Sequence, residues 1–376
     1  MDKINMVDLK TQYEKIKSEV DKGIQDVISQ AAFINGPQVK TFQSELGEYM
    51  GVKHAMTCGN GTDALQIAMM ALGLKPGDEV ITSDFTFIAT VEVIALLGLK
   101  PVLVDVDPET FTLDIDRVKA AITPKTKAIV PVHLFGQSAP MEELMAIAKE
   151  NNLYVIEDTA QAIGSDYKFS DGSTAKVGTI GDIGCTSFFP SKNLGCYGDG
   201  GALFTNDNVL GEKIRSIINH GSKVKYYHDM IGVNSRLDTI QAAILLAKLP
   251  HLDAYSAARQ RAADYYDAAF ADCKKLITPK RADFSTHTFH QYTMVTKGID
   301  RDALKQHLLD NNIPCAVYYP VPLHSQKAFD GYESNDADFP VTNRLVQEVI
   351  SLPMHTELQE DQLRYITEAV LAFVNQ

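Results

Sequence analysis

The stretch 186–201 contains a lysine whose surroundings favour nucleophilic chemistry. It reads T-S-F-F-P-S-K-N-L-G-C-Y-G-D-G-G and lies between two apolar segments that we expect to be strands. Lys192 therefore occupies a turn among small and apolar neighbours, where partial desolvation favours the neutral amine. A neutral lysine amine can attack an aldehyde and hold it as a Schiff base. A surface lysine in an ordinary loop is the alternative, and other stretches of the chain decide between the two.

A second stretch has the pattern of a phosphate-binding turn. Residues 54–58 read as a short strand, 59–63 as a glycine turn, and Ala64 opens a strongly apolar helix. This order of strand, glycine turn and helix start offers free backbone N–H groups to a phosphate. Gly61 permits close approach of a ligand, and Thr62 can cap the helix or bind the ligand itself. A plain capped turn has the same pattern, so this stretch alone does not establish a phosphate site.

The chain between residues 79 and 158 alternates apolar strands with amphipathic helices. We therefore predict an α/β fold with a mostly parallel central sheet covered by helices on both faces. Ligands of such sheets bind at the carboxyl ends of the strands. The residues expected at those ends are Gly61, Thr62, Phe85 to Phe87, His133, Asp158 and Gln161.

We expect two domains with a boundary near Leu252. Residues 1–252 would form the large domain with its N-terminal helix, and residues 253–376 a smaller C-terminal α/β domain. A long helical region from residue 239 to about 271, interrupted near Pro250, crosses this boundary. The smaller domain is expected to contain strands at 291–295 and 315–319, a helix at 301–311 and two final helices.

Composition excludes several classes of partner. The 376 residues include 45% hydrophobic and 22% charged residues, as in an ordinary globular enzyme, and the formal net charge of −13 argues against nucleic acid or an anionic membrane. Five cysteines, an odd number without metal-ligand spacing, indicate a reduced cytoplasmic setting and no metal site. The N-terminus has no signal-peptide pattern, and no apolar run is long enough to span a bilayer.

The candidate residues together describe a pyridoxal phosphate site. This cofactor needs a lysine for its aldehyde and a carboxylate facing its pyridinium nitrogen, which keeps the ring an electron sink. Lys192 fits the first role and Asp158, at a strand end, fits the second. Glu157 is the competing carboxylate, but strand alternation points it to the other face. Lys192 would also carry the proton once a substrate amine displaces it.

On these motifs the chain resembles the DegT/DnrJ/EryC1/StrS family of sugar aminotransferases, which have the aspartate aminotransferase fold (fold type I). The resemblance extends over essentially the whole chain, and its motifs are specific only in combination. They are C-G-N-G-T-D-A-L, F-T-F-I-A-T, P-V-H-L-F-G-Q, V-I-E-D-T-A-Q-A-I-G, S-F-F-P-S-K-N-L-G, G-D-G-G-A, N-S-R-L-D-T-I-Q-A-A and Y-Y-P-V-P-L-H.

The resemblance implies a role for each residue that matches the family's cofactor site. Lys192 would bind pyridoxal phosphate covalently, and Asp158 would pair with the pyridinium nitrogen. Gln161 would contact the ring oxygen or face, and Phe87 would stack on the ring. The residues implied to hold the phosphate are Gly61, Thr62 and Ser187.

The resemblance also implies a homodimer with shared active sites. Asn234 would reach the phosphate from the neighbouring subunit, and Arg236 would pair with a sugar carboxylate from there. Close relatives have His-Tyr-Pro where this chain has Tyr318, Tyr319 and Pro320, which places the two tyrosines at the sugar.

Within the family, the chain looks most like the 3-aminotransferases that act on UDP-2-acetamido-2-deoxy-3-oxo-glucuronate. These use glutamate as amino donor and serve bacterial O-antigen synthesis. One branch of the family has histidine in place of the lysine and performs dehydration, so Lys192 favours transamination.

Three alternatives remain on the basis of sequence. One is an aminotransferase for another UDP- or dTDP-linked ketosugar, and another is a non-catalytic regulator on the same fold, against which the intact Lys192 and Asp158 argue. A nicotinamide dehydrogenase is disfavoured because no G-x-G-x-x-G follows the first strand.

Overall fold

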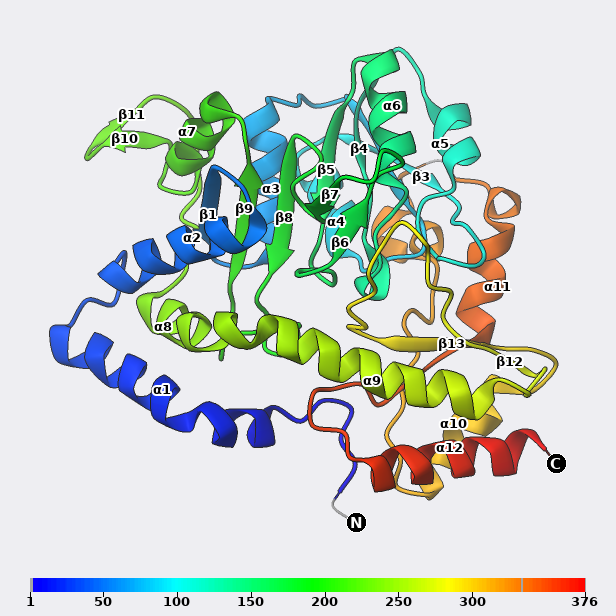
Figure 1. Cartoon of the computed structure of the whole chain (residues 1–376). Helices are drawn as coiled ribbons and strands as arrows, with labels where there is room; N and C mark the ends of the chain where they lie inside the picture. The colour runs from blue at the N-terminus through cyan, green and yellow to red at the C-terminus, as the bar shows by residue number, and fades with distance from the viewer. Residues whose placement is uncertain (1–2, 333, 376) are drawn as a thin grey trace.

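A seven-stranded sheet forms the centre of the molecule in this computed structural model, which describes residues 3–332 and 334–375 (Figure 1). The strand order is β1-β9-β8-β5-β4-β2-β3, and only β9 runs against the others. The prediction of a mostly parallel sheet is therefore confirmed. The strands are β1 His54–Cys58, β2 Glu79–Ser83, β3 Lys100–Val104, β4 Thr126–Val130, β5 Tyr154–Asp158, β8 Ile183–Ser187 and β9 Gly201–Thr205.

Helices cover both faces of this sheet, as continuous apolar strands require. One face packs against α3 (Gly61–Leu72), α4 (Ala89–Leu96) and α7 (Asn208–Ile217). The other face packs against α2 (Pro37–Met50), α5 (Ile115–Ala121), α6 (Met141–Asn151) and α8 (Thr239–Lys248). Side chains alternate along the strands, so Val130 and Ile156 pack against the first group of helices, whereas Ile129 and Val155 pack against the second group.

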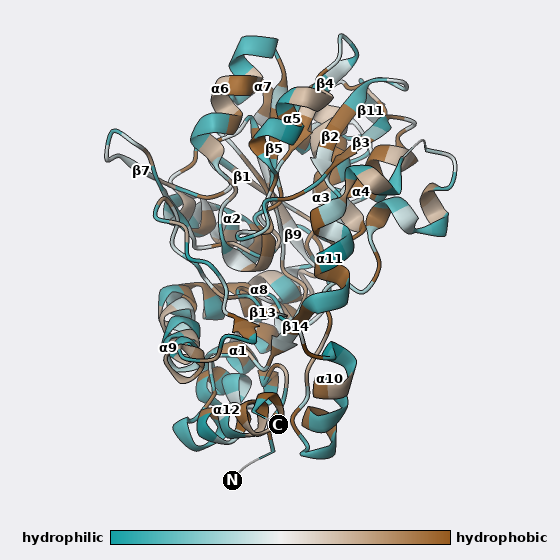
Figure 2. Cartoon of the chain, turned by 90° about the vertical axis from the view of Figure 1, so that its right-hand side faces the viewer, coloured by the Kyte–Doolittle hydropathy of each residue, from teal (hydrophilic) through white to brown (hydrophobic). Residues whose placement is uncertain are grey.

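A second core lies below the large sheet (Figures 1 and 2). It is built from α9, α10, α12 and an antiparallel sheet of order β12-β13-β14. In Figure 2 both α10 and α12 carry hydrophilic and hydrophobic residues, as amphipathic helices do. The elements are α9 Leu252–Phe270, β12 Leu276–Ile277, β13 Tyr292–Thr296, α10 Arg301–Asp310, α11 Pro340–Glu348, β14 Val349–Leu352 and α12 Glu360–Val374.

The remaining elements are peripheral. Helix α1 (Leu9–Gln30) packs along α8, and the 3-10 turn η2 (Leu249–His251) with Pro250 separates α8 from α9. Two short hairpins are β6 (Asp166–Lys168) with β7 (Thr174–Lys176), and β10 (Ser222–Val224) with β11 (Tyr227–His228). Further 3-10 turns are η1 Leu134–Gly136, η3 Leu323–Ser325, η4 Lys327–Phe329 and η5 Asp336–Asp338.

One predicted strand is wrong. Residues 315–319 form no strand; only Ala316 pairs, in an isolated bridge with Ser351 of β14. Beyond this bridge the chain leaves the small sheet, and Tyr319 packs against Phe85 and Phe135 beside the large sheet instead. Tertiary contact thus overrides a β-favouring sequence. The domain boundary near Leu252 stays a prediction.

Two negative findings apply to residues 3–332 and 334–375. No helix in this range combines the length and hydropathy needed to cross a bilayer. Within the same range, no group of three or more His, Cys, Asp or Glu side chains could hold a metal ion.

The close packing of β8 gives a stability prediction. A Cβ placed on Gly184 would lie 1.9 Å from the carbonyl oxygen of Gly178, so Gly184→Ala must displace backbone. We expect it to lower the free energy of unfolding by about 3 kcal/mol or more.

Gly47→Ala in α2 is the control, because its Cβ would meet no atom closer than 3.5 Å. Helix propensity should then leave stability unchanged or raise it by up to about 1 kcal/mol. Equal denaturation midpoints for Gly184→Ala and the wild type would contradict this packing.

Candidate active site

The ends of β5 and β8 and the start of α3 meet at one edge of the large sheet. Asp158 is the last residue of β5, Ser187 the last of β8, and Gly61 the first of α3. Gly201, which opens β9, pairs with both Cys58 and Ser187 and so brings the turn after β1 beside the end of β8. A Cβ on Gly61 would lie 2.7 Å from that of Ser187, so this close approach requires glycine.

Lys192 lies in the loop that joins β8 to β9 above this edge. Its backbone N–H donates to the carbonyl of Phe189 at 2.8 Å, which closes the turn. Burial lowers the pKa of Lys192 to about 8, while the negative charge of Asp158 opposes this shift. A lysine with this pKa is neutral far more often at physiological pH than a surface lysine, so it is a competent nucleophile.

Asp158 is a buried carboxylate with neutral donors only. Thr90 Oγ1 donates to its Oδ2 at 2.8 Å, and the Ala160 N–H donates to its Oδ1 at 3.1 Å. The carboxylate is 6% exposed and forms no ion pair with any described residue. A buried carboxylate without a cationic partner is expensive, so this site favours a ligand that brings a positive charge.

Thr90 is a site residue that the sequence analysis missed. It is the second residue of α4 and is fully buried beneath Asp158. The signal was present, because Thr90 ends the F-T-F-I-A-T motif that follows β2 at the same sheet edge as Asp158. Its contact depends on two segments 68 residues apart, which spacing alone does not connect.

Glu157, the competing carboxylate, points to the opposite face and is fully used there. It accepts from the backbone N–H groups of Gly178, Ile180 and Gly181 at 2.8, 2.7 and 2.6 Å. His133 Nε2 lies 3.0 Å from Glu157 Oε2. Because the Ala139 N–H donates to His133 Nδ1, the imidazole proton is on Nε2 and donates to Glu157. His133 therefore has a structural role, and Asp158 is the carboxylate free for a ligand.

Gln161 links the sheet edge to the segment that carries the two tyrosines. Its Oε1 accepts from the Phe135 N–H at 2.6 Å, and its Nε2 donates to the Tyr319 hydroxyl at 3.0 Å. The ring of Tyr319 lies 6.2 Å from that of Phe87, which is 55% exposed. The ring centroids of Tyr318 and Tyr319 are 6.1 Å apart. The structure thus brings Gln161, Phe87 and both tyrosines together.

No hydrogen bond, ion pair or ring contact among the described residues joins Asn234 or Arg236 to Lys192. Asn234 is exposed and pairs with Asn219, and Arg236 has no ion pair among the described residues. Ser235 between them is buried; it donates to Asp63 at 2.6 Å and accepts from the Gly59 N–H at 2.8 Å. Their proposed reach into a neighbouring subunit therefore stays a prediction.

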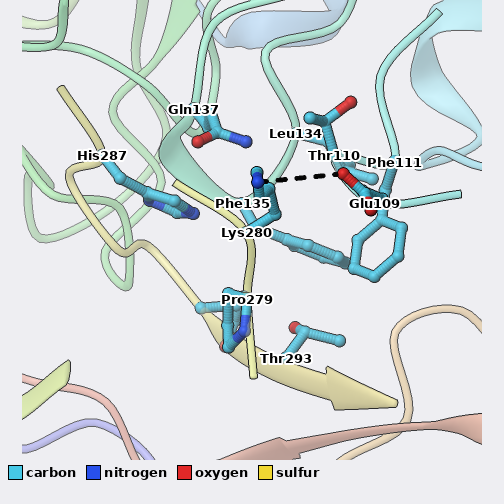
Figure 3. A pocket seen from close by; sticks show the side chains of 11 residues that line it. Glu109, Thr110, Phe111, Leu134, Phe135, Gln137, Pro279, Lys280, His287 and Thr293 are labelled. Atoms are coloured by element: carbon cyan, nitrogen blue, oxygen red, sulfur yellow. Dashed lines mark ion pairs between the residues drawn. The ribbon is translucent and has the colours of Figure 1, made fainter. Parts of the chain in front are cut away.

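A recess beside Phe135 is too small to be the ligand site (Figure 3). Its volume of about 10 Å³ leaves room for about one water molecule at most. Lys280 and Glu109 form an ion pair at 3.9 Å on its rim, shown by the dashed line.

These features fit pyridoxal phosphate. The neutralised Lys192 suits an aldehyde, and the unpaired Asp158 suits a protonated ring nitrogen. The N-terminus of α3, capped by Asn60 and approached by Ser187, suits a phosphate. Each component of the cofactor finds a group of matching chemistry at one sheet edge.

Comparison with known proteins agrees with this fit. The model of the DegT/DnrJ/EryC1/StrS aminotransferase family matches residues 14–371. A protein of Geobacillus stearothermophilus named pleiotropic regulatory protein is 47% identical over 98% of both chains. The UDP-2-acetamido-2-deoxy-3-oxo-D-glucuronate aminotransferase of Pseudomonas aeruginosa is 45% identical over 98% of this chain and 99% of that protein.

Other similar proteins act on other sugars or hold the cofactor. A dTDP-3-amino-3,4,6-trideoxy-alpha-D-glucose transaminase of Streptomyces venezuelae is 36% identical over 98% of this chain and 95% of that protein. The crystal structure of ntda from Bacillus subtilis with bound cofactor PMP has a TM-score of 0.91 and 28% identity. That alignment covers all of this chain and 86% of the other.

The buried hydrogen bond from Thr90 to Asp158 gives the next prediction. Thr90→Val preserves the side chain's shape and removes the donor, so we expect turnover at saturating pyridoxal phosphate to fall about tenfold. Thr90→Ser keeps the hydroxyl and should retain most of the rate. Steady-state kinetics on the three proteins checks this, and equal turnover numbers for the valine and serine variants would rule out the role of the hydrogen bond.

Proposed function

The chain belongs to the DegT/DnrJ/EryC1/StrS aminotransferase family of pyridoxal phosphate-dependent sugar aminotransferases, and we propose that it transfers an amino group from L-glutamate to a nucleotide-linked ketosugar. One observation carries the proposal. Burial lowers the pKa of Lys192 to about 8, and the nearby carboxylate of Asp158 forms no ion pair with any described residue. Burying a lysine and a carboxylate together costs stability, and a regulator without catalysis would not require it.

The proposed mechanism assigns one task to each side chain. When bound, pyridoxal phosphate supplies an electrophilic aldehyde carbon and a ring that withdraws an electron pair from the substrate. Lys192 Nζ would bind the aldehyde carbon, and its free amine would carry the proton at the reacting carbon. Asp158 would face the ring nitrogen and favour its protonated form, and the hydrogen bond from Thr90 holds Asp158 in place.

The remaining cofactor residues bind and orient. Gly61, Thr62 and Ser187 would hold the phosphate through backbone N–H and hydroxyl groups. Gln161, fixed by Phe135 and Tyr319, would lie against the ring, and Phe87 would stack on it. Together these contacts would exclude water from the reacting carbon.

We propose UDP-2-acetamido-2-deoxy-3-oxo-glucuronate as the substrate and O-antigen or lipopolysaccharide synthesis as the setting. The Pseudomonas relative carries that substrate in its name, and the family resemblance gives Arg236 to the sugar carboxylate. Tyr318 and Tyr319 would contact the sugar. The relative named for a dTDP-linked sugar supports a second candidate, an aminotransferase for another UDP- or dTDP-ketosugar.

We propose a homodimer in which each subunit completes the other's site. The hairpin of β10 and β11 projects beyond α7 (Figure 1) and, with the following loop, exposes Tyr226, Tyr227 and Ile231 by 80, 72 and 86%. Large apolar residues this exposed are typical of a surface that another chain covers. A cytoplasmic location is also proposed, and the five free cysteines support a reducing compartment.

A substrate panel tests the proposed function. Wild-type protein incubated with pyridoxal phosphate, glutamate and UDP- or dTDP-ketosugars should convert the UDP-linked 3-oxo-glucuronate fastest. Lys192→Ala should lower that rate by about 10³-fold or more, because both the covalent link and the proton carrier are lost. Amino-sugar formation followed by mass spectrometry measures both. Lys149→Ala, at an exposed position on α6, is the matched control. Undiminished turnover in Lys192→Ala would reject the mechanism, and a faster dTDP-sugar would reassign the substrate.

Arg236 allows a test of the shared site. Arg236→Ala should raise the KM for the ketouronate at least about 30-fold, because the substrate carboxylate loses its cation. Arg215→Ala on α7 is the exposed arginine control. Heterodimers of Arg236→Ala and Lys192→Ala subunits should regain activity, since one of their two sites has both residues. Verified heterodimers without activity would place Arg236 in its own subunit's site or away from substrate.

A further inference from the structure

A segment from the C-terminal part of the chain is fastened along the large sheet beside the active site. Residues 318–329, which we call the strap, lie against residues 84–91 that follow β2. The ring centroid of Tyr319 lies 6.1 Å from that of Phe85 and 6.2 Å from that of Phe87. Leu323 packs with Val91, and its N–H donates to the Asp84 carbonyl at 3.3 Å. The strap thus carries Tyr319 and meets Phe87.

A buried carboxylate and a histidine hold the middle of the strap. His324 Nδ1 lies 2.6 Å from Asp84 Oδ2, and the His324 N–H donates to Asp84 Oδ1 at 2.7 Å. The side chains of Asp84 and His324 are 0 and 3% exposed. His324 Nε2 lies 3.1 Å from Asp336 Oδ1, and its ring stacks on Phe339 at 4.4 Å. Because each ring nitrogen faces a carboxylate, this geometry favours the imidazolium form of His324, in which both nitrogens donate.

The neighbouring strand provides a second attachment of the same kind. Asp105, which follows β3, accepts from the N–H groups of Val341 and Thr342 at 2.8 and 2.9 Å and so holds the start of α11. A cavity of about 180 Å³ lies against β3, lined in part by Phe329 of the strap and by Phe339. Asp84 thus holds the strap itself, and Asp105 holds the start of α11, which follows it in the chain.

We propose that His324 is a positioning residue of the active site: clamped between Asp84 and Asp336, it holds the strap so that Tyr319 and Phe87 keep their places at the sheet edge. The inference rests on the proposed function of these two aromatic residues. His324 itself touches no reacting atom; it acts through Tyr319, five residues away on the strap, and through Phe87, three residues beyond Asp84.

The clamp depends on pH in a defined direction. Burial lowers the pKa of His324, but the hydrogen bonds and charges of Asp84 and Asp336 outweigh burial and raise it above 6.5. A raised histidine pKa stabilises the folded state fully below 6.5, and this stabilisation is lost as pH rises through the raised value. Burial, with Asp105 adding to it, raises the pKa of Asp84 despite His324, so the clamp also weakens when strong acid protonates Asp84. The clamp is tightest between these two pKa values.

Two variants separate the halves of the clamp. His324→Asn places an amide where Nδ1 was and can still donate to Asp84, whereas His324→Gln places its amide toward Asp336. We expect His324→Gln to raise the KM for the ketosugar about tenfold, as loss of a hydrogen bond to a charged group predicts, with little change in kcat. His324→Asn should restore most of the wild-type KM. His307→Gln on α10, whose imidazole meets only the Ala369 carbonyl and the Phe373 ring, is the control.

Hydrogen exchange gives a readout independent of activity. Peptides covering the strap should exchange faster in His324→Gln than in the wild type and His307→Gln. Corrected for intrinsic rates, wild-type exchange in the strap should rise as pH passes above the raised histidine pKa, and His324→Gln should lack this rise. Unchanged strap exchange in His324→Gln would overturn the clamp, and faster exchange with an unchanged KM would overturn its positioning role. A wild type inactive on every sugar would reject the proposed function, while the exchange data would still decide the clamp.

Discussion

Burying an amine and a carboxylate at the same sheet edge is the constraint on which the rest of this structure depends. Desolvation lowers the pKa of Lys192 to about 8, and Asp158 limits that shift without forming a direct ion pair. The buried carboxylate would be more costly without the neutral donors Thr90 and the Ala160 N–H, and a rigid frame holds both groups in place. The frame is the parallel sheet, whose strands β5 and β8 end side by side and whose next loop brings Lys192 back over Asp158.

Two consecutive acidic residues acquire opposite roles because a strand alternates. Glu157 faces the interior and receives three backbone N–H groups and His133, so its charge is fully compensated. Asp158 faces the edge, where the described residues provide it with two donors, the Thr90 hydroxyl and the Ala160 N–H. One carboxylate therefore stabilises the fold of residues 178–181, and its neighbour stays available for a cationic ring nitrogen.

The same sheet edge serves a second purpose at its far side. The carboxylates that follow β2 and β3 hold the returning chain rather than a ligand, Asp84 through His324 and Asp105 through the start of α11. The strap thereby brings Tyr319, from the C-terminal part of the chain, into contact with Gln161 and Phe87, which follow strands of the large sheet. The site is thus assembled by contacts across both parts of the chain.

The sequence by itself determined the sheet class and most of the elements, and it predicted Lys192 and Asp158 as the two central residues of the site. Apolar periodicity, glycine turns and the neighbours of Lys192 and Asp158 are local properties, so the sequence alone reveals them. The sequence did not determine the roles of Thr90, His133 and His324, nor that residues 315–319 leave the small sheet. Those depend on contacts between segments 24 to 240 residues apart, and only the tertiary structure decides which buried polar group finds which partner.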